Sequence, residues 1–519
     1  MNSSDLHITL SETELAQALD NCAKEPIHLT DAIQPHGVLF VLSNPDMAIL
    51  QASNNTTEFF GRAASSLIHK PINTLLGNHQ EKALRNIITS GDLQPIKSIV
   101  LDVSHHNTKR RFDAAIHQSH NYLILEMEPT PLDDDASDLQ NFYDHLRRFS
   151  VKLRQSTTLG VLYQTVVDEV RAITGFDRVK LYQFDEDWHG SVVSESRAEF
   201  MPSYLGLRFP ASDIPEQARK LYSKSYLRLI ADIHYEPVPL IPQDNPDSHG
   251  ATDLSLSVLR SVSPVHLQYL DNMKVNASMS VSVIHNQRLW GLIACHHNEP
   301  KYVPYKVRMI TELIGHIFSS HLFTLEETRR SEQQQRQKFL LAEIAAGITP
   351  EKTLEETLRT QSNLFYDVVD ADGVMVLIGD DTYPFGETPG EKSLQTILDW
   401  LKTTHAQKYF TTSRLSEHVD IPGEDKATFA GLLAIPIDDD SRNHILWFRK
   451  EVIRHINWAG KPEKRIAMDS VGFRLTPRGS FTLWKETLQG TAHRWTDGNL
   501  QAAERVAEIL AEKLKKHHK

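Results

Sequence analysis

The sequence predicts an α+β protein in which three antiparallel-sheet domains are joined by long helices. The chain has 519 residues, which is enough for about three to four domains. Clusters of short alternating apolar runs, separated by turn residues, are typical of antiparallel sheets. A helical pattern over residues 304–346 would measure about 60 Å, twice the width of a small domain, and is typical of a helix between domains.

The composition is that of a globular protein without a disulfide framework. Hydrophobic residues make up 40% and charged residues 24% of the chain. Cys22 and Cys295 are the only cysteines in the sequence, which excludes C-x-x-C motifs and favours a reducing cytosol. A net charge of −12 argues against nucleic acid as a partner. The sequence shows neither a signal-peptide pattern nor an apolar run near ~18 residues, so we expect no membrane segment and a cytoplasmic chain.

The first predicted domain covers residues 23–130 and follows an N-terminal segment, 1–22. Its apolar runs have the length and spacing of short strands, with one helical stretch between them. A turn-rich acidic linker, 129–138, ends it. The predicted strands are 37–42, 48–50 and 122–126, and the predicted helix is 80–89.

The second predicted domain covers residues 137–320 and begins with apolar residues at helical spacing. A strand pattern follows at 178–184. Two further strands, 278–284 and 289–295, are separated by a polar turn and therefore form an antiparallel hairpin. The long helix, 304–346, leaves this domain, and its apolar first half could pair with a second copy, so we expect a homodimer.

The third predicted domain, 330–500, repeats the outline of the second. Its strand patterns at 372–377 and 445–449 parallel two strands of the second domain, which indicates a weak internal repeat. An excursion at 454–495 contains an alternating strand pattern, and such long insertions are usually functional. The final helix, 497–519, has Asp497 as a candidate N-cap and a basic last turn.

Two strings contain most of the candidate functional residues. In Pro210–Pro215 the two prolines restrain the backbone around Asp213, so that its carboxylate is held in a defined direction; the alternative is that Asp213 caps a helix beginning at Pro215. In the second string, Arg260 precedes His266 and Tyr269, which share one face if the stretch is helical.

Each of these candidates also has a purely structural interpretation. His266 alone is more often a half-buried histidine than a catalytic base, and His296 simply ends a strand. Cys295 lies in an apolar strand and is expected in the core, whereas Cys22 lies in a polar stretch and is expected to be exposed. The sequence contains no P-loop, G-x-G-x-x-G, G-x-S-x-G or H-E-x-x-H motif, and we expect no metal site and no catalytic residue.

Together these strings resemble the photosensory core of a bacterial phytochrome, with its PAS, GAF and PHY domains. The resemblance extends from about Cys22 to the final helix. It is carried by Ile33-Gln-Pro-His-Gly37, Phe209-Pro-Ala-Ser-Asp-Ile-Pro215, Ser263-Pro-Val-His-Leu-Gln-Tyr269, Trp290-Gly-Leu-Ile-Ala-Cys-His-His297, Trp458-Ala-Gly460 and Pro477-Arg-Gly-Ser-Phe481. It implies that the three domains are a PAS domain, a GAF domain and a GAF-like PHY domain whose excursion is the family's tongue.

The resemblance implies a red/far-red light photoreceptor with a linear tetrapyrrole as its cofactor. Cys22 corresponds to the thioether donor to the vinyl group of ring A. Val265 stands where plant and cyanobacterial relatives have their attaching cysteine, which points to biliverdin. Arg228 and Arg260 would serve one propionate. The remaining implied cofactor-binding residues are Ser278 and Ser280 for the second propionate, Asp213 and His266 near the pyrrole nitrogens, Tyr182, Phe209, Tyr269 and His296 around ring D, and Ile214, Tyr222 and Ser263.

The resemblance also implies a signalling route. The Asp213 side chain would pair with Arg478 of the tongue in the dark, red-absorbing state and shift towards Ser480 after rotation about the 15,16 double bond, while the tongue refolds from strand to helix. Trp458 and Trp484 complete the implied tongue residues. The long helices would relay the change to an output module beyond residue 519, such as a histidine kinase or diguanylate cyclase, so this chain itself is expected to be no enzyme.

Two departures from the family pattern and two alternative functions stay open. Lys180 stands on a pocket strand where relatives usually have an apolar residue, and Ala459 stands where the tongue usually has glycine. A GAF-type sensor of an anionic small metabolite would use the same arginines but would have no need for Cys22 or the tongue. A thiol enzyme using Cys22 with His36 has no identifiable oxyanion hole.

Overall fold

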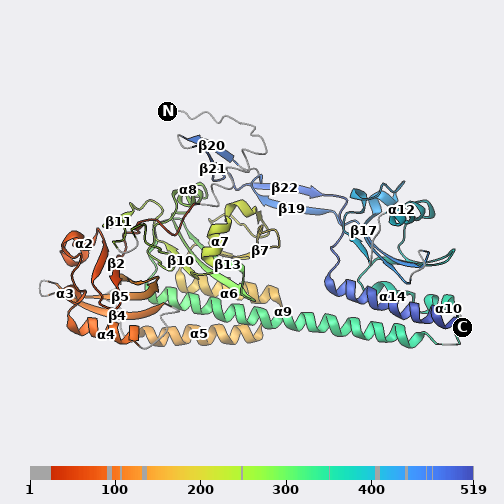
Figure 1. The fold of residues 1–519 in the computed structure, drawn as a ribbon, viewed down its shortest axis with the longest axis horizontal. Coiled ribbons are helices and arrows are strands. Elements are labelled where there is room, and N and C mark those ends of the chain that lie inside the picture. The colour runs from red at the N-terminus through yellow and green to blue at the C-terminus, as the bar shows by residue number, and fades with distance from the viewer. Residues whose placement is uncertain are drawn as a thin grey trace. The chain divides into compact units, whose positions relative to one another are not determined.

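The computed structural model describes residues 25–89, 96–105, 108–130, 137–246, 249–349, 351–403, 409–438, 442–462, 465–469 and 472–517. The chain forms two compact units, the first up to Leu325 together with Asn457–Trp484, and the second from Glu326 to Ile456 and from Lys485 onward. Helices alternate with sheets whose strands are almost all antiparallel (Figure 1), which confirms the predicted fold class.

The first sheet has the strand order β1-β11-β3-β2-β6-β5-β4. Its centre is apolar on both faces, because one face packs on short helices and the other is covered by residues from the second predicted domain. Strand β11 comes from that later segment and lies between β1 and β3, a pairing that local sequence does not indicate. The elements are β1 Ala32–Ile33, β2 Val38–Ser43, β3 Ile49–Ser53, β4 Lys97–His105, β5 Thr108–Ser119, β6 Tyr122–Pro129, β11 Val238–Ile241, α2 Thr56–Phe60, α3 Asn73–Leu76, α4 Asn78–Thr89 and a 3-10 turn Ala64–Ser66.

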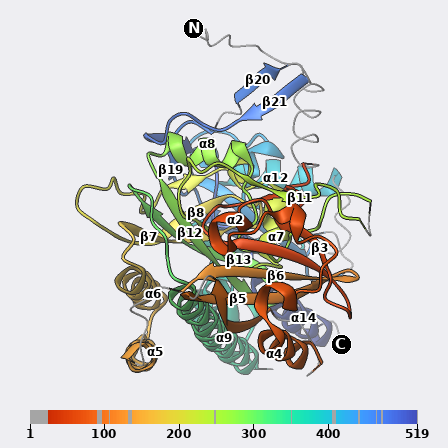
Figure 2. The ribbon, with the colours of Figure 1, turned by 90° about the vertical axis from the view of Figure 1, so that its left-hand side faces the viewer.

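The second sheet has the order β10-β12-β13-β7-β8-β9-β19-β22 and separates a helical layer from a pocket. In β12, Met279, Val281 and Val283 enter the helix-side core, and the serines between them point to the opposite face. Figure 2 shows α5, α6 and α9 nearly end-on, on one side of β12 and β13. The elements are α5 Ser137–Gln155, α6 Leu159–Thr174, β7 Arg178–Phe184, β8 Gly190–Arg197, β9 Arg208–Phe209, a 3-10 turn Ala211–Asp213, α7 Glu216–Tyr222, β10 Leu227–Ile230, α8 Pro264–Asn272, β12 Ala277–His285 and β13 Arg288–His297.

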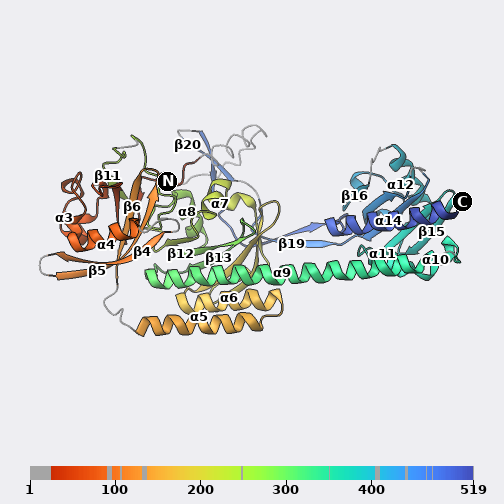
Figure 3. The same ribbon diagram turned by 60° about the horizontal axis from the view of Figure 1, so that its bottom comes forward.

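Helix α9 runs without a break from Tyr305 to Gly347, 43 residues, as the sequence predicted. Within the first unit its buried face consists of Ile310, Ile314, Phe318 and Leu322, which pack in the same core as β12 and β13. Figure 3 shows α5 and α6 beside the first part of α9. In the described part of the chain, no helix has an apolar stretch long enough to span a membrane.

The second unit contains the five-stranded sheet β15-β14-β18-β17-β16. The side chain of Trp447, on the central strand β18, is fully buried in the core of this unit. The predicted cap of the last helix is wrong by one residue. Thr496 accepts the Asn499 backbone N–H at 3.2 Å, while Asp497 is already helical. The elements are α10 Leu354–Thr360, α11 Ser362–Asp367, β14 Gly373–Ile378, β15 Asp381–Gly386, α12 Glu391–Thr403, β16 Phe410–Thr412, a 3-10 turn Leu415–Glu417, α13 Asp425–Thr428, β17 Phe429–Pro436, β18 His444–Lys450 and α14 Asp497–His517.

The predicted excursion consists of two strand pairs. Strands β19 and β22 are neighbours, and β20 pairs with β21. The pattern predicted at 471–476 corresponds to β21, although Val471 lies outside the described residues. Trp458 of β19 pairs with Arg208 of β9, which brings this segment into the second sheet. The bounds are β19 Arg454–Ala459, β20 Arg465–Asp469, β21 Gly472–Thr476 and β22 Leu483–Leu488.

A buried histidine in the first sheet predicts acid sensitivity. His117 of β5 is 1% exposed, and neither ring nitrogen has a hydrogen-bond partner among the described residues. Burial lowers its pKa to about 4. The unfolded chain binds this proton at a higher pH than the folded chain does. Stability is therefore present above about pH 6.5 and is lost as the pH falls towards 4, by about 3 kcal/mol for this group.

We expect His117→Leu to reduce the fall in the free energy of unfolding between pH 7 and pH 4 by about 3 kcal/mol, measured by urea denaturation. The exposed His79 of α4 offers the matched control, His79→Leu. An equal pH dependence in wild type and His117→Leu would show that the buried ring does not resist protonation.

Candidate functional site

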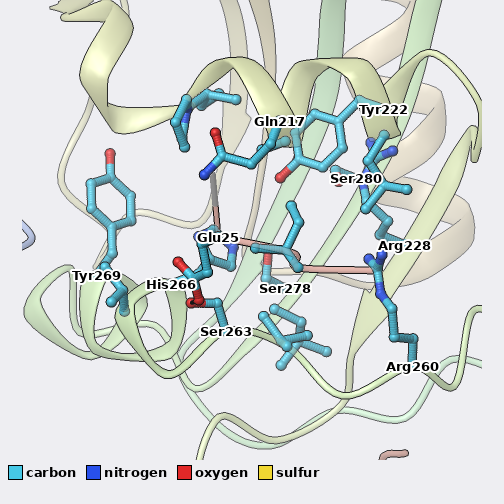
Figure 4. A pocket seen from close by; sticks show the side chains of 18 of the residues that line it. Glu25, Gln217, Tyr222, Arg228, Arg260, Ser263, His266, Tyr269, Ser278 and Ser280 are labelled. Carbon is cyan, nitrogen blue, oxygen red and sulfur yellow. Dashed lines mark hydrogen bonds between the residues drawn. The ribbon is translucent and has the colours of Figure 1, made fainter. Parts of the chain in front are cut away.

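A cavity lies on the serine face of the second sheet. Its empty space is about 1380 Å³, part of which is open to solvent. Helices α7 and α8 form two of its walls and β10 and β12 its floor (Figure 4). The start of the first domain, with Glu25, and the excursion, with Arg478, contribute its edges. The predicted residues that line it are Asp213, Ile214, Tyr222, Arg228, Arg260, Ser263, His266, Tyr269, Ser278, Ser280 and Arg478.

Arg228 is held at one end of the cavity by hydroxyl and carbonyl oxygens. It lies opposite Ser280 in the β10–β12 pair, and its Nε donates to Ser280 Oγ at 3.0 Å. Its Nη1 donates to the Ser225 carbonyl at 2.6 Å and to Ser282 Oγ at 3.1 Å. The guanidinium lies 3.8 Å from the centre of the Tyr222 ring, and burial lowers its pKa to about 10. Its Nη2, also buried, has no hydrogen-bond partner in the structure.

Arg260 lies beside Arg228 in Figure 4, but fewer hydrogen bonds hold its side chain. Its Nε and Nη1 are buried and have no hydrogen-bond partner in the structure. Burial lowers the pKa of this arginine, and Glu126 opposes the effect. Buried guanidinium donors without partners are costly, so this end of the cavity is suited to an anionic group such as a carboxylate.

The centre of the cavity is formed by α8. His266 and Tyr269 lie three residues apart on one face, as predicted, with their rings stacked at 6.1 Å between centroids. Burial lowers the pKa of His266 to about 4, so the ring is neutral at pH 7. Ser263, just before the helix, donates to Glu25 Oε1 at 3.0 Å.

Asp213 joins the cavity to the excursion. Arg478 donates from Nε to Asp213 Oδ1 at 3.1 Å and from Nη2 to Oδ2, and Tyr269 donates its hydroxyl to Oδ2 at 2.9 Å. The side chains of Asp213 and Arg478 are only 5% and 7% exposed. The alternative interpretation of Asp213 as a helix cap is wrong, because α7 begins at Glu216 and Pro215 occupies its cap position without a side-chain bond.

An aromatic cluster adjoins the cavity without lining it. The rings of Tyr182 and Phe209 lie 5.7 Å apart, and both belong to an apolar cluster that Tyr269 and Ile214 contact. His296 is buried and accepts a hydrogen bond from Arg178 Nη2 at its Nδ1, 3.0 Å away, so its proton resides on Nε2. Burial and neighbouring cations keep the pKa of this ring low.

Lys180, the first departure noted in the sequence, points into the same cluster. Its Nζ lies 5.2 Å from the centre of the Phe209 ring and 5.4 Å from that of Tyr204. Burial lowers its pKa to about 7. Ala459, the second departure, is fully buried, and its carbonyl accepts from Arg478 Nη1.

The other predicted tongue residues lie close to this contact. The Trp458 ring lies 5.3 Å from the Arg208 guanidinium and 5.3 Å from the His189 ring. The Ser480 hydroxyl bonds to that of Thr482 at 2.9 Å. Trp484 is half-buried in β22.

Of the two cysteines, only one can be placed. Cys295 is fully buried in the helix-side core, as predicted, and burial raises its pKa. Cys22 lies outside the described residues. Among the residues that the structure describes, no group of three or more His, Cys, Asp or Glu side chains could hold a metal ion.

Several cavity residues were not predicted. Glu25 and Gln34 come from the start of the first domain, and Gln34 donates from Nε2 to the Leu229 carbonyl at 2.8 Å. Arg219 of α7 supports the turn next to Asp213 by donating to the Ile214 carbonyl at 2.6 Å. Gln34 belongs to the string Ile33-Gln-Pro-His-Gly37, but none of these residues was assigned to the site, because each reaches it through contacts distant in the sequence or through a turn.

Comparison with known proteins assigns the three regions to families. The sequence profile of the PAS fold matches residues 22–130, that of the GAF domain 158–319, and that of the phytochrome region 335–519. A bacteriophytochrome from Xanthomonas campestris pv. campestris is 34% identical over 509 residues, covering 95% of this chain and 78% of that protein. Cyanobacterial phytochrome B from Nostoc sp. is 40% identical over 486 residues, covering 93% of this chain and 65% of that protein.

Solved structures agree with these assignments. A bacteriophytochrome from R. palustris superimposes with a TM-score of 0.83 at 35% identity, over 96% of this chain and 99% of that one. The photosensory core module of a Stigmatella aurantiaca phytochrome gives a TM-score of 0.80 at 36% identity, over 96% and 98%. The chain spans 63 to 66% of the length of the two Nostoc phytochromes and of a Synechocystis relative. The chain belongs to the phytochrome family and has its PAS, GAF and PHY domains.

Proposed function

We propose that the chain is a red/far-red light photoreceptor that holds biliverdin in the cavity of its second sheet, covalently linked to Cys22. The observation that carries the proposal is a pair of buried arginines at one end of the cavity. Among the described residues, Arg228 Nη2 and Arg260 Nε and Nη1 have no hydrogen-bond partner. A linear tetrapyrrole with two propionates has both the acid groups and the apolar length that such a cavity suits.

In this proposal each cavity residue has a defined task. Arg228 and Arg260 bind one propionate, and Ser278 and Ser280 the other, although Ser280 Oγ already accepts from Arg228 and so belongs to both groups. The neutral imidazole of His266 and the Asp213 backbone serve the pyrrole nitrogens. Tyr182 and Phe209, in the cluster that adjoins the cavity, and the buried His296 would surround the far end of the ligand.

The attachment and the signal depend on residues at the two ends of the site. The Cys22 thiol would add across the vinyl double bond of ring A, so that a carbon–sulfur bond forms and the thiol proton passes to the other vinyl carbon. When bound, the pigment supplies absorption of red light and rotation about its 15,16 double bond. Asp213 lines the cavity and accepts a hydrogen bond from Arg478, so a movement of the ligand would act on the tongue through this pair.

We also propose the domain limits, the dimer and the signalling residues that the resemblance implies. The domain limits are the predicted ones, with the tongue at 454–495. The chain acts as a cytoplasmic homodimer through its long helices and relays the tongue change to an output module beyond residue 519. Arg478, Ser480, Trp458 and Trp484 are the signalling residues of the tongue.

We expect the purified chain to become coloured with biliverdin and to interconvert between two absorbance bands under red and far-red light. Cys22→Ser should lose the covalent adduct on a denaturing gel, with loss of nearly all pigment from the band, while native protein still binds the pigment. Cys295→Ser is the matched control and should keep the adduct, because that thiol is fully buried. A chain that stays colourless with biliverdin would refute the proposal.

The second candidate is a sensor of an anionic small metabolite, which the same partnerless guanidinium donors would favour. Such a sensor has no use for a thioether or for light. Binding of a dicarboxylate with an affinity above that for biliverdin, and without any light-induced spectral change, would favour this candidate.

A further inference from the structure

A buried carboxylate outside the cavity supports one of the two ligand-binding arginines. Glu126 of β6 is 3% exposed and accepts two backbone N–H groups, from Leu259 to Oε1 at 2.8 Å and from Val258 to Oε2 at 3.3 Å. These two residues come immediately before Arg260. The opposite side of the same segment is held by the N-terminal chain, where the Gln34 N–H donates to the Leu259 carbonyl at 2.7 Å and the Ser261 N–H to the Ala32 carbonyl at 3.0 Å.

Glu126 therefore holds the backbone from which the Arg260 side chain projects. Its Nε and Nη1 have no hydrogen-bond partner in the structure, so no side-chain bond from these atoms fixes it. The Glu126 charge also stabilises the Arg260 cation. Because Glu126 lies in the first sheet, the arginine is placed by a domain other than the one that forms the cavity floor.

Glu126 is one of two neighbouring acids on the same face of β6, and the second is already neutralised. Glu128 accepts from Arg308 Nη2 of α9 and from the Tyr302 hydroxyl at 3.1 Å, and His36 lies 3.7 Å away. Arg308 is 2% exposed. Among the described residues Glu126 forms no ion pair, so it is the acid of this group that can change its charge.

We propose that Glu126 is a positioning residue for Arg260 and takes up a proton when an acidic group of the ligand binds to that arginine. The inference rests on the proposed function, since it assumes a ligand carboxylate at Arg260. A new negative charge there competes with Glu126 for the same cation and repels the ionised form of the acid, which favours its protonated form.

The electrostatics of the cluster agree with this role. Burial raises the pKa of Glu126 to about 7, with Glu128 adding to the rise and the two backbone donors and Arg308 opposing it. The other titratable or charged groups around the two acids are Arg260 in the adjoining segment, His36 after β1, Tyr302 before α9, Tyr305 on α9 and Asp113 on β5. Burial keeps His36 neutral, with a pKa of about 4, and raises those of Tyr302 and Tyr305, so none of these three titrates near pH 7.

The direction of the pH effect follows from linkage. Near pH 7 about half of the Glu126 side chains are ionised in the free chain, and binding shifts them to the protonated form. A rise of about one unit in the pKa of Glu126 on binding would take up about 0.4 proton at pH 7 through this residue. If the ligand raises the pKa of Glu126 by about one unit, affinity should fall about tenfold as the pH rises from 6 to 9.

The test is calorimetric titration of the full Cys22→Ser chain with biliverdin, in buffers of different ionisation enthalpy, which reports the protons taken up. Glu126→Gln should lower that number by about 0.4 at pH 7 and flatten the pH dependence of the affinity. Glu58→Gln, an exposed acid of α2 in the same domain, is the matched control and should change neither.

The outcomes separate this inference from the function on which it rests. Biliverdin binding with an unchanged proton number in Glu126→Gln would overturn the inference and leave the photoreceptor proposal intact. Absence of any biliverdin binding would overturn both. If Glu126→Gln does not fold, Arg260→Gln keeps the buried acid and decides the matter, because the proton uptake should then be lost, and an unchanged uptake would overturn the inference.

Discussion

Replacement of Arg478 by alanine is expected to release the segment 457–484 from the cavity. The substitution leaves the Asp213 carboxylate, 5% exposed, without its guanidinium partner, and breaking a buried pair in this way costs about 3–5 kcal/mol. It also removes the donor to the Ala459 carbonyl, so the local strand pairing loses a second contact. Hydrogen exchange of peptides from residues 457–462 and 477–484 should accelerate by about two to three orders of magnitude.

A double-mutant cycle with Asp213→Ala separates the pair from general damage. The double variant should lose less protection than the sum of the two single variants, because no unpaired charge then stays buried. Arg454→Ala is the matched control, since Arg454 is an exposed arginine of the same excursion and bonds to His493. Additive effects of the two substitutions would show that the ion pair does not hold the segment.

Replacement of Arg260 by glutamine is expected to weaken pigment binding without unfolding the chain. The arginine offers two buried donors that lack partners, and a charged hydrogen bond contributes about 1.5–3 kcal/mol, so affinity should fall about 10- to 100-fold. Fluorescence quenching of the Cys22→Ser chain by biliverdin measures this affinity without the covalent adduct. The urea midpoint should stay within the range of ordinary surface substitutions.

Arg228→Gln provides a contrast within the same cavity. Its guanidinium also bonds to Ser225, Ser280 and Ser282, so this substitution should reduce both affinity and stability. Lys224→Gln, an exposed cation next to β10, should change neither quantity. Equal losses of stability in Arg260→Gln and Arg228→Gln would contradict the expectation that the hydrogen bonds of Arg228 stabilise the fold and that Arg260 contributes less.

Regular elements with a clear period were predictable from the sequence. The strand predicted at 178–184 has the bounds of β7, and the uninterrupted pattern after Val307 is helix α9. Strands β4 and β5 were missed, because the first half of β5 is charged and hides the alternation of its second half. The predicted cap at Asp497 was wrong because threonine and aspartate are both favoured at the N-cap position, and only the hydrogen bonds show that Thr496 occupies it.

Many of the predicted site residues line the cavity, but their arrangement was not predictable. The spacing of His266 and Tyr269 indicated a shared helical face, and the alternation in β12 places its serines on the cavity face. Local sequence favoured a helix cap for Asp213, yet its carboxylate binds Arg478, 265 residues later. Glu126 offered no signal, because its partners are backbone N–H groups, which any residue has.

The sequence by itself determined the α+β class, the long connecting helix and the chemical types of the site residues, because periodicity and side-chain chemistry are local properties. Only the tertiary structure decided that β11 joins the first sheet and that Tyr269 joins the buried pair of Asp213 and Arg478, a pair that the family resemblance had implied. It also decided which arginine atoms lack partners. Contacts between distant segments depend on how the faces of sheets and helices pack. Each unpaired charge buried in such a contact carries a large desolvation cost.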